Sequence, residues 1–176
     1  MILIEFLSTE KIPPETHQAI DELDHLAFQS VGGPVGADTI KWASSQWMGL
    51  GWIQDQLVVQ LGCLQRKIRV AGRPIRVAGI GGVATHPNFQ RRGFARQLMA
   101  ATAAYIQQDF QIPFGLLICD GLPCEFYQKI GWTIVGDHLL YQQEGRHLRL
   151  NTTVMALSLI DSSFPVGEID LCGVPW

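Results

Sequence analysis

The sequence predicts an α/β (α+β) fold in which about seven strands form one central sheet and helices flank it. Two observations support this prediction. Strand-like segments recur along the chain, and segments with the apolar spacing of helices interrupt them. At one handover from strand to helix, the stretch Gln90-Arg91-Arg92-Gly93-Phe94-Ala95 places a glycine among arginines. The sequence therefore predicts a mixed fold with a distinctive loop before one helix.

The first half of the chain is typical of a strand, a helix and three further strands. Residues 2–7 alternate weakly, and Pro13-Pro14-Glu15 then begins a helix, since proline is tolerated in a first turn. Gly32-Gly33-Pro34 ends this helix, and we expect a second, short helix over about 38–44. The three strands that follow are expected near 48–53, 57–70 and 73–85, with turns at Asp55-Gln56 and Ala71-Gly72.

The second half alternates helices with strands. Gly93 to Phe110 is expected to be a helix. Residues 114–119 are almost continuously apolar, which is typical of a strand buried on both faces. A short helix over 122–130 is closed by Gly131, and the final strands are expected over 132–135 and 152–159. The predicted order is β-α-α-β-β-β-α-β-α-β-β.

Length and composition favour one globular domain over residues 1–176. Hydrophobic residues make up 47% of the chain and charged residues 16%, which argues against disorder. The apolar stretches are too short and too interrupted to span a bilayer, and the first residues lack the basic start of a secretory signal. The four cysteines show no metal-ligand spacing. We therefore expect a reduced, cytoplasmic protein that holds no metal and does not bind a membrane.

Charge is distributed unevenly although the net charge is only −3. Eight of the 13 basic residues lie between Arg66 and Arg96, whereas the first 38 residues carry seven acids and one lysine. A basic middle suits a polyanionic cofactor, and acidic flanks would attract a cationic acceptor. Ordinary solvated surface charge is the alternative explanation. Nucleic-acid binding is disfavoured because the chain is acidic and lacks interleaved aromatic and basic residues.

The stretch around Gly93 and a tyrosine some thirty residues later together indicate acyl transfer. Backbone N–H groups at a helix start can surround a phosphate, and a glycine lets the phosphate approach the main chain. Tyr127, in Phe126-Tyr127-Gln128-Lys129-Ile130-Gly131-Trp132, could donate a proton to a leaving group. An anion cradle with a proton donor predicts transfer of an acyl group from a phosphate-bearing carrier.

These motifs and the order of elements resemble the GNAT superfamily of acetyl-CoA-dependent N-acetyltransferases. Gln90-x-x-Gly93-x-Ala95 is similar to the pyrophosphate loop of that family, and Phe126-Tyr127-x-x-x-Gly131-Trp132 to its Phe-Tyr-x-x-x-Gly-Phe segment. The resemblance implies a mixed, mostly antiparallel sheet that is splayed between its fourth and fifth strands. It also implies acetyl-CoA as the cofactor and an acyltransferase of the N-acetyltransferase class.

Within that superfamily, the chain looks most similar to the aminoglycoside 2′-N-acetyltransferases. Arg66-Lys67-Ile68, the run Gly79–Ala84 and the ending Asp170–Trp176 carry this resemblance. Two positions depart from it. Gly81 stands where those enzymes carry a glutamate proposed to act as a base through water, and Leu171 replaces a tryptophan. The resemblance thus supports the cofactor site more strongly than an aminoglycoside acceptor.

The resemblance assigns the cofactor site residue by residue. Main-chain groups of the strand end would bond the pantetheine arm, and the loop and helix start would hold the pyrophosphate. Gly79, Gly81 and Gly82 weaken the strand and allow it to splay from the next one, although a β-bulge without a ligand is the alternative. The cofactor-binding residues are then Val83, Ala84, Thr85, Gln90, Arg91, Arg92, Gly93, Phe94, Ala95 and Arg96.

Tyr127 is the expected catalytic residue, as general acid to the departing sulfur. A buried aromatic ring with a purely structural hydroxyl is the alternative. No general base stands out, because His86, Asp120 and Glu125 each have a structural explanation, and Cys124 is a weak candidate for an acyl-carrying nucleophile.

The acceptor is expected to be a small, cationic primary amine. Asp38, Asp170 and the carboxylate of Trp176 are its candidate binding residues. A second hypothesis is a non-catalytic acyl-CoA-binding module that has lost the base. The sequence is compatible with a homodimer and does not decide the oligomeric state.

Overall fold

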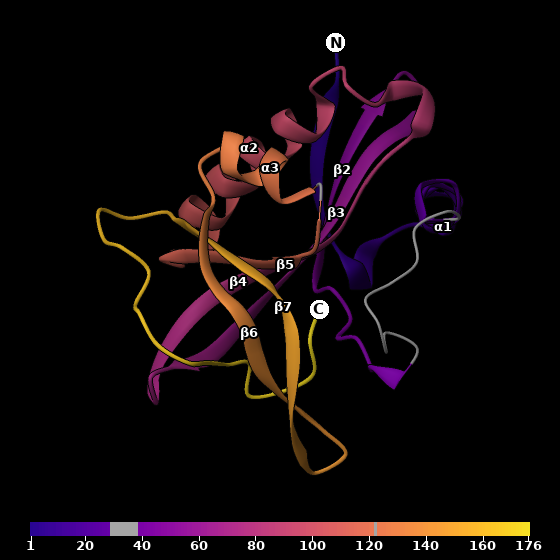
Figure 1. The fold of residues 1–176 in the computed structure, drawn as a ribbon. Coiled ribbons are helices and arrows are strands. Elements are labelled where there is room, and N and C mark those ends of the chain that lie inside the picture. Colours follow the sequence, from indigo (N-terminus) through magenta and orange to yellow (C-terminus); the bar gives the residue numbers. More distant parts are fainter. Residues whose placement is uncertain (29–38, 122) are drawn as a thin grey trace.

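The computed structural model describes residues 1–28, 39–121 and 123–176, and within them one eight-stranded sheet carries helices on its faces (Figure 1). The strand order is β1-β2-β3-β4-β5-β7-β6-β8. The elements are β1 (Leu3–Ser8), α1 (Pro14–Phe28), β2 (Trp47–Ile53), β3 (Gln56–Val70), β4 (Arg73–Thr85), α2 (Phe94–Tyr105), β5 (Phe114–Cys119), α3 (Pro123–Lys129), β6 (Thr133–Gln143), β7 (Arg146–Ser158) and β8 (Ile169–Asp170).

Most strand pairs are antiparallel, which confirms the predicted mixed sheet. β1 to β4 form a meander, and β5, β7 and β6 form a second antiparallel group. The two groups are joined by the parallel pair β4–β5. The two-residue β8 adds one strand to the predicted seven, because it pairs with β3 and also contacts β6.

Helices cover the two faces of the β3–β4 region. α1 buries Ile20 and Leu23 against strand residues that include Ala84. α2 buries Leu98 and Met99 on the cluster that contains Ala78. On β3, the partners of Ala84 and Ala78 are Gln60 and Gln65, which are five residues apart, and successive strand residues point to opposite faces of a sheet. The two helices therefore lie on opposite sides of β4, and we call these sides the α1 face and the α2 face.

β4 and β5 part after a short paired stretch. Their ladder consists of Val77 with Phe114, Ala78 with Gly115, and Gly79 with Leu116. β4 nevertheless continues to Thr85 and β5 to Cys119. The splay expected between the fourth and fifth strands is thus confirmed. It leaves the edge of β4 that faces β5 without strand partners beyond Gly79.

A β-bulge lies in this unpaired part of β4. Gln60 and Gly62 of β3 are two residues apart, but their partners Ala84 and Gly81 are three apart. The extra residue falls beside Gly82, whose φ of 58° favours glycine. A bulged strand bends and twists more strongly, and this bulge lies just beyond the point where the splay opens.

Two sequence-based expectations about elements were wrong. Residues 40–44 form no helix, while Asp38 lies outside the described residues. The last two strands are much longer than the predicted 132–135 and 152–159, because they continue into a hairpin that turns at Gly145. This hairpin carries many polar residues, so its pairing is not visible as apolar alternation. No helix in the described part of the chain is long and apolar enough to cross a membrane.

Candidate functional site

The start of α2 presents free backbone N–H groups. Its N-cap residue is Gly93, which has a φ of 83° and supplies no side-chain cap. The N–H groups of a first helical turn have no partner within the helix, and the helix dipole adds positive potential there. A Cβ atom at Gly93 would meet no other atom within 4 Å. An anionic group therefore has open space directly against these donors.

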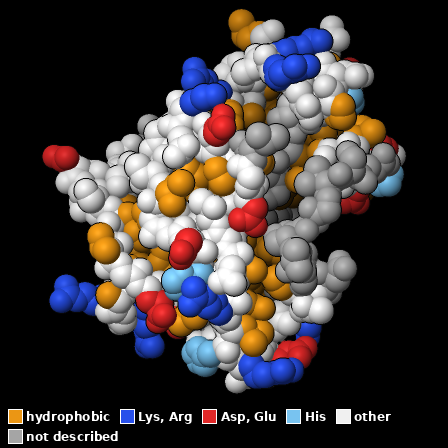
Figure 2. Space-filling view, viewed as in Figure 1, with side chains coloured by type: hydrophobic (Ala, Val, Ile, Leu, Met, Phe, Trp, Pro, Cys, Tyr) orange, Lys and Arg blue, Asp and Glu red, His pale blue; other side chains and the backbone are white. Residues whose placement is uncertain are grey.

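Exposed arginines surround the same helix start. Arg91, Arg92 and Arg96 are exposed, and none of them forms an ion pair with a described residue. The Arg92 guanidinium lies 5.2 Å from the ring centre of Phe89. Figure 2 shows Lys and Arg side chains gathered over the loop between β4 and α2. Forked arginine donors fit phosphate oxygens well, so charge and backbone donors converge here.

The end of β4 leads directly into this loop. Val83, Ala84 and Thr85 lie past the last β4–β5 pair, so their edge toward β5 has no strand partner. A Cβ atom at Gly82 would also meet nothing within 4 Å. An extended amide-bearing chain could pair with this edge like an added strand. The predicted cofactor residues are thus brought together in one continuous stretch.

Tyr127 lies on α3, which follows β5 on the other side of the splay. Its side chain is 8% exposed and packs against Phe126 and Trp132, with ring centres 5.1 and 6.2 Å away. Its hydroxyl forms no hydrogen bond with the described residues and is not among the fully buried polar atoms. Burial raises the pKa of Tyr127, with smaller contributions from the nearby thiols of Cys119 and Cys124. The phenol therefore stays protonated at neutral pH.

The spacing between Tyr127, Gly131 and Trp132 has a packing explanation. Gly131 has a φ of 94° and lets the chain leave α3. The Trp132 backbone N–H then donates a hydrogen bond to the Tyr127 carbonyl at 3.1 Å, and the Trp132 ring lies over Gly115 of β5. The Gly-Trp pair thus fixes the tyrosine relative to β5.

The Cys119 thiol beside Tyr127 shows no sign of an activated nucleophile. Burial is the main cause that raises the pKa of Cys119 to about 12. The Cys124 sulfur lies 3.5 Å from the Cys119 carbonyl oxygen. A nucleophilic cysteine needs a lowered pKa, so Cys119 is a packing residue.

The other candidate bases have structural partners. His86 caps the turn after β4, where its Nδ1 accepts from the Asn88 N–H at 3.2 Å. Asp120 accepts from the Thr152 hydroxyl and the Thr153 N–H at 3.0 and 3.1 Å. Glu125 lies 3.9 Å from Lys129 on the exposed side of α3. Each of these three side chains therefore has a structural partner and is not singled out as a general base.

Trp176 lies on the α1 face of the sheet, where the splay begins. A Cβ atom at Gly79 would be 2.6 Å from its Nε1, and one at Gly81 would be 3.1 Å from its main-chain carbonyl carbon. The Arg66 guanidinium lies 5.1 Å from the indole ring centre. Gly79 is therefore required for the close approach of Trp176, and Gly81 makes that approach easier. Trp176 was a predicted acceptor-binding residue.

Asp170 and Trp176 do not share one pocket. The Asp170 carboxylate accepts from the Cys172 N–H at 2.8 Å. On β3, Asp170 pairs with Arg69. Gly79, which contacts Trp176, pairs with Leu64, five residues away on the same strand. At about 3.4 Å per residue, these places are roughly 17 Å apart along the strand. Asp38, the third predicted acceptor residue, lies outside the described residues.

Sequence reasoning missed a polar pair on the α1 face. Gln60 of β3 is 1% exposed, and its amide donates to the Asp24 carboxylate of α1 at 2.7 Å. Its Oε1 is buried without a hydrogen-bond partner. Desolvation raises the pKa of Asp24. In the sequence, the only sign of this pair was a glutamine inside the otherwise apolar run 57–64.

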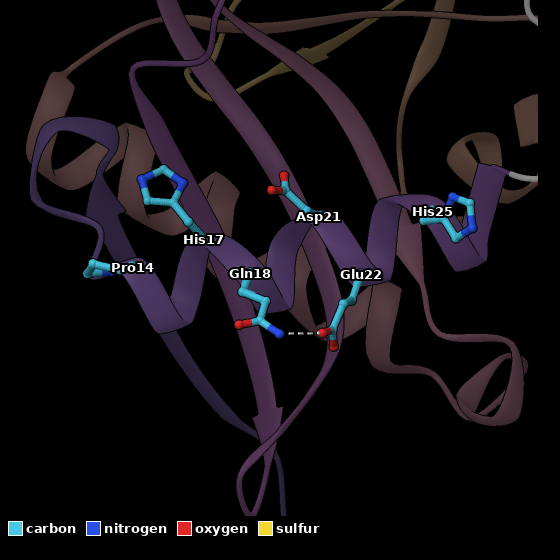
Figure 3. A pocket seen from close by; sticks show the side chains of 6 residues that line it. All are labelled: Pro14, His17, Gln18, Asp21, Glu22 and His25. Atoms are coloured by element: carbon cyan, nitrogen blue, oxygen red, sulfur yellow. Dashed lines mark hydrogen bonds between the residues drawn. The ribbon is translucent and has the colours of Figure 1, made fainter.

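A shallow depression also lies along the outward side of α1 (Figure 3). Gln18 and Glu22 point to the same side there and are hydrogen bonded at 2.9 Å. The described residues contain no group of three or more His, Cys, Asp or Glu side chains able to hold a metal ion. The depression offers no convergent chemistry comparable to the start of α2. Its lining residues are Pro14, His17, Gln18, Asp21, Glu22 and His25.

Comparison with known proteins places this geometry in a family. The family model described as "Acetyltransferase (GNAT) domain" matches residues 9–135. This chain belongs to the GNAT acetyltransferase family. The matched region contains the β4 edge, the α2 cradle and Tyr127, and the family is one of acyltransferases.

Solved structures share the GNAT fold with this domain at low sequence identity. Escherichia coli ElaA is 20% identical, with a TM-score of 0.62, over 90% of this chain and 100% of its own. The E. coli N-acetyltransferase YhbS, crystallised with CoA, is 16% identical, with a TM-score of 0.66 and coverages of 97% and 89%. A Brucella melitensis GNAT acetyltransferase, crystallised with acetyl-CoA, is 13% identical, with a TM-score of 0.62 and coverages of 95% and 94%.

Replacing Gly79 with alanine should expel Trp176 from the sheet. The new Cβ would overlap the indole ring, and such overpacking costs about 1–3 kcal/mol of unfolding free energy. Chemical denaturation measures this loss. Gly173→Ala is the matched control, because its Cβ would stand 3.4 Å from the Arg66 side chain. The explanation fails if Gly79→Ala costs as much in a Trp176→Ala background as it does alone.

Proposed function

We propose that this GNAT domain transfers an acetyl group from acetyl-CoA to the primary amine of a small, cationic acceptor. One observation carries the proposal. The unpaired edge of β4 continues directly into the uncapped, arginine-rich start of α2, and Tyr127 stands across the splay on α3. The two structural relatives crystallised with acetyl-CoA or CoA support this choice of carrier.

The chain offers a matching group for each part of the carrier. The first-turn N–H groups of α2 and the arginines would bind the diphosphate. The β4 edge over Val83–Thr85 would pair with the amides of the pantetheine arm. The carrier supplies an acetyl thioester that is activated toward an amine. A Cβ atom at Gly82 or Gly93 would meet nothing within 4 Å, which leaves space for such a ligand beside both glycines.

Tyr127 would stabilise the departing sulfur. Its neutral hydroxyl can donate a hydrogen bond to the developing thiolate and pass on a proton as the amine nitrogen loses one, so the reaction yields an amide and a thiol. Because burial raises its pKa, Tyr127 would take its proton back and be neutral again before the next round of transfer. The protein's part is to hold this donor in place through Trp132 and Phe126.

Charge on the α1 face supports a cationic acceptor. α1 carries Glu15, Asp21, Glu22 and Asp24 and contains no Lys or Arg. This helix packs against β3 and β4. Negative potential raises the local concentration of cations and speeds their association. The sequence resemblance to the aminoglycoside 2′-N-acetyltransferases makes aminoglycosides one class to include in the acceptor screen.

A non-catalytic acyl-CoA-binding module is the second candidate function. Gly81 favours it, since the resembled enzymes carry a glutamate there and the Trp176 main chain lies against this glycine. Release of free thiol from acetyl-CoA in the presence of amines separates the two functions. A module would bind acetyl-CoA and release none.

Replacing Gly93 with glutamate should weaken acetyl-CoA binding by about ten-fold or more, since a repelling charge would enter the phosphate cradle. Isothermal titration calorimetry measures the dissociation constant. Gly72→Glu is the control, because Gly72 also has a positive φ and open surroundings but lies in the β3–β4 turn. Unchanged affinity in Gly93→Glu would remove the cofactor assignment.

Replacing Tyr127 with phenylalanine should lower kcat by about 10²-fold, as loss of a general acid does, with little change in acetyl-CoA affinity. The raised pKa also predicts no alkaline fall in wild-type kcat from this group below about pH 10. Steady-state kinetics and a pH profile test both. Tyr141→Phe, at another buried tyrosine, is the control. Full activity in Tyr127→Phe would show that Tyr127 is a packing residue and not the general acid.

An amine panel that includes aminoglycosides and polyamines should show a preference for cations that weakens as salt rises above about 0.1 M. Asp170→Asn keeps an oxygen for the Cys172 N–H and removes only charge. It should leave KM for the preferred amine unchanged within about two-fold, because Asp170 lies roughly 17 Å along β3 from Gly79, where the splay opens. A neutral or anionic best acceptor contradicts the cationic proposal. A KM raised several-fold in Asp170→Asn would return Asp170 to the acceptor site.

A further inference from the structure

The indole N–H of Trp176 is buried without a hydrogen-bond partner. Among the described residues, only Gln60 Oε1 shares this condition. A buried donor that has lost its water and gained no partner destabilises the folded protein, and native structures rarely keep one without a reason. A ligand that supplies the missing oxygen would provide such a reason.

The ring is held in this position by the segment that carries it, residues 171–176. The Leu171 N–H donates to the Leu140 carbonyl at 2.9 Å, and the Gly173 carbonyl accepts from Gln142 at 3.0 Å. The Val174 carbonyl accepts from the Arg66 guanidinium, and the Pro175 carbonyl accepts from Ala43 at 2.6 Å. Four anchors in six residues fix the main chain. The unpaired N–H is therefore part of a well-supported arrangement.

The ring occupies a defined place relative to the proposed chemistry. Gly79 is the last β4 residue paired with β5, so the indole lies where the two strands part. Gly79 and Arg66 are on the α1 face, whereas Ala78 and Ile80 pack with Tyr127 on the α2 face. A molecule that reaches the splay from the α1 face would pass Trp176 before it meets a group held beside Tyr127.

We propose that Trp176 determines acceptor specificity by donating its indole N–H to an oxygen of the amine acceptor. The inference rests on the proposed function. It predicts that the domain prefers amines that also carry an ether, hydroxyl or carbonyl oxygen over alkylamines of the same shape. Reaching the N–H requires a shift of the indole or of the Arg66 side chain that covers the ring. Both are side-chain movements that leave the sheet intact.

Matched amines test this preference directly. 2-Methoxyethylamine and butylamine have the same shape, as do 2-aminoethanol and propylamine, and only the first member of each pair has an oxygen. Thiol release from acetyl-CoA is compared at equal concentrations of neutral amine. One hydrogen bond predicts about a ten-fold higher kcat/KM for the oxygen-bearing member. The same kinetics are measured for the best acceptor of the wider panel.

Replacing Trp176 with benzothienylalanine removes the N–H and keeps the ring, since sulfur takes the place of nitrogen. The variant should raise KM about ten-fold for the oxygen-bearing amines and for the best acceptor. It should leave the alkylamines and the acetyl-CoA dissociation constant unchanged. Its folded stability should be equal or higher, because an unsatisfied donor is gone. Benzothienylalanine at Trp42, which is 42% exposed, is the control.

The outcomes separate the inference from the proposed function. Equal use of both members of each pair, with an unchanged KM for the best acceptor in the variant, overturns the inference while acetyl transfer stands. A change confined to kcat or to acetyl-CoA affinity assigns the N–H to the acetyl oxygen and also overturns it. A less stable variant shows that the N–H has a structural partner, with the same consequence. No thiol release by the wild type with any amine removes the proposed function and the inference with it.

Discussion

The parting of β4 from β5 after three paired residues is the constraint on which the rest of the site depends. Backbone groups inside a sheet are normally paired, so an unpaired strand edge in the middle of one must find other partners. Here that edge runs from Ile80 to Thr85 and passes directly into the open start of α2. The fold thereby presents backbone donors and acceptors in the centre of the molecule, where a peptide-like ligand can use them.

Glycines keep this opening accessible and also decide what covers it. Gly82 and Gly93 have positive φ values and open surroundings, so they shape the cofactor side. Gly79 and Gly81 instead allow the Trp176 ring and main chain to lie directly on β4. The same short run of glycines therefore has two uses. The space beside Gly82 is left open, and the surface over Gly79 and Gly81 is covered by a segment that is far away in sequence.

The sequence was sufficient for the elements with strong local patterns. The continuous run at β5 and the paired strands β3 and β4 were predicted almost to the residue, because their apolar residues and turns are local signals. The β6–β7 hairpin was underestimated, since its polar stretches are stabilised by cross-strand hydrogen bonds that no local pattern reveals. The Asp24–Gln60 pair was missed for a similar reason. The pair forms only because a helix and a strand lie together in the fold, although the two residues are 36 positions apart in the sequence.

By itself, the sequence determined the order of most elements from β1 to β7, the basic loop around Gly93 and the Tyr127 segment, because these depend on neighbouring residues and on backbone conformation. Only the tertiary structure decided which of these features meet. It separated Asp170 from Trp176 along β3, gave His86, Asp120 and Glu125 structural partners, and placed the unpaired indole N–H of Trp176 where β4 leaves β5. Such juxtapositions arise from strand register and from packing between distant segments, and neither is encoded in any single stretch of the chain.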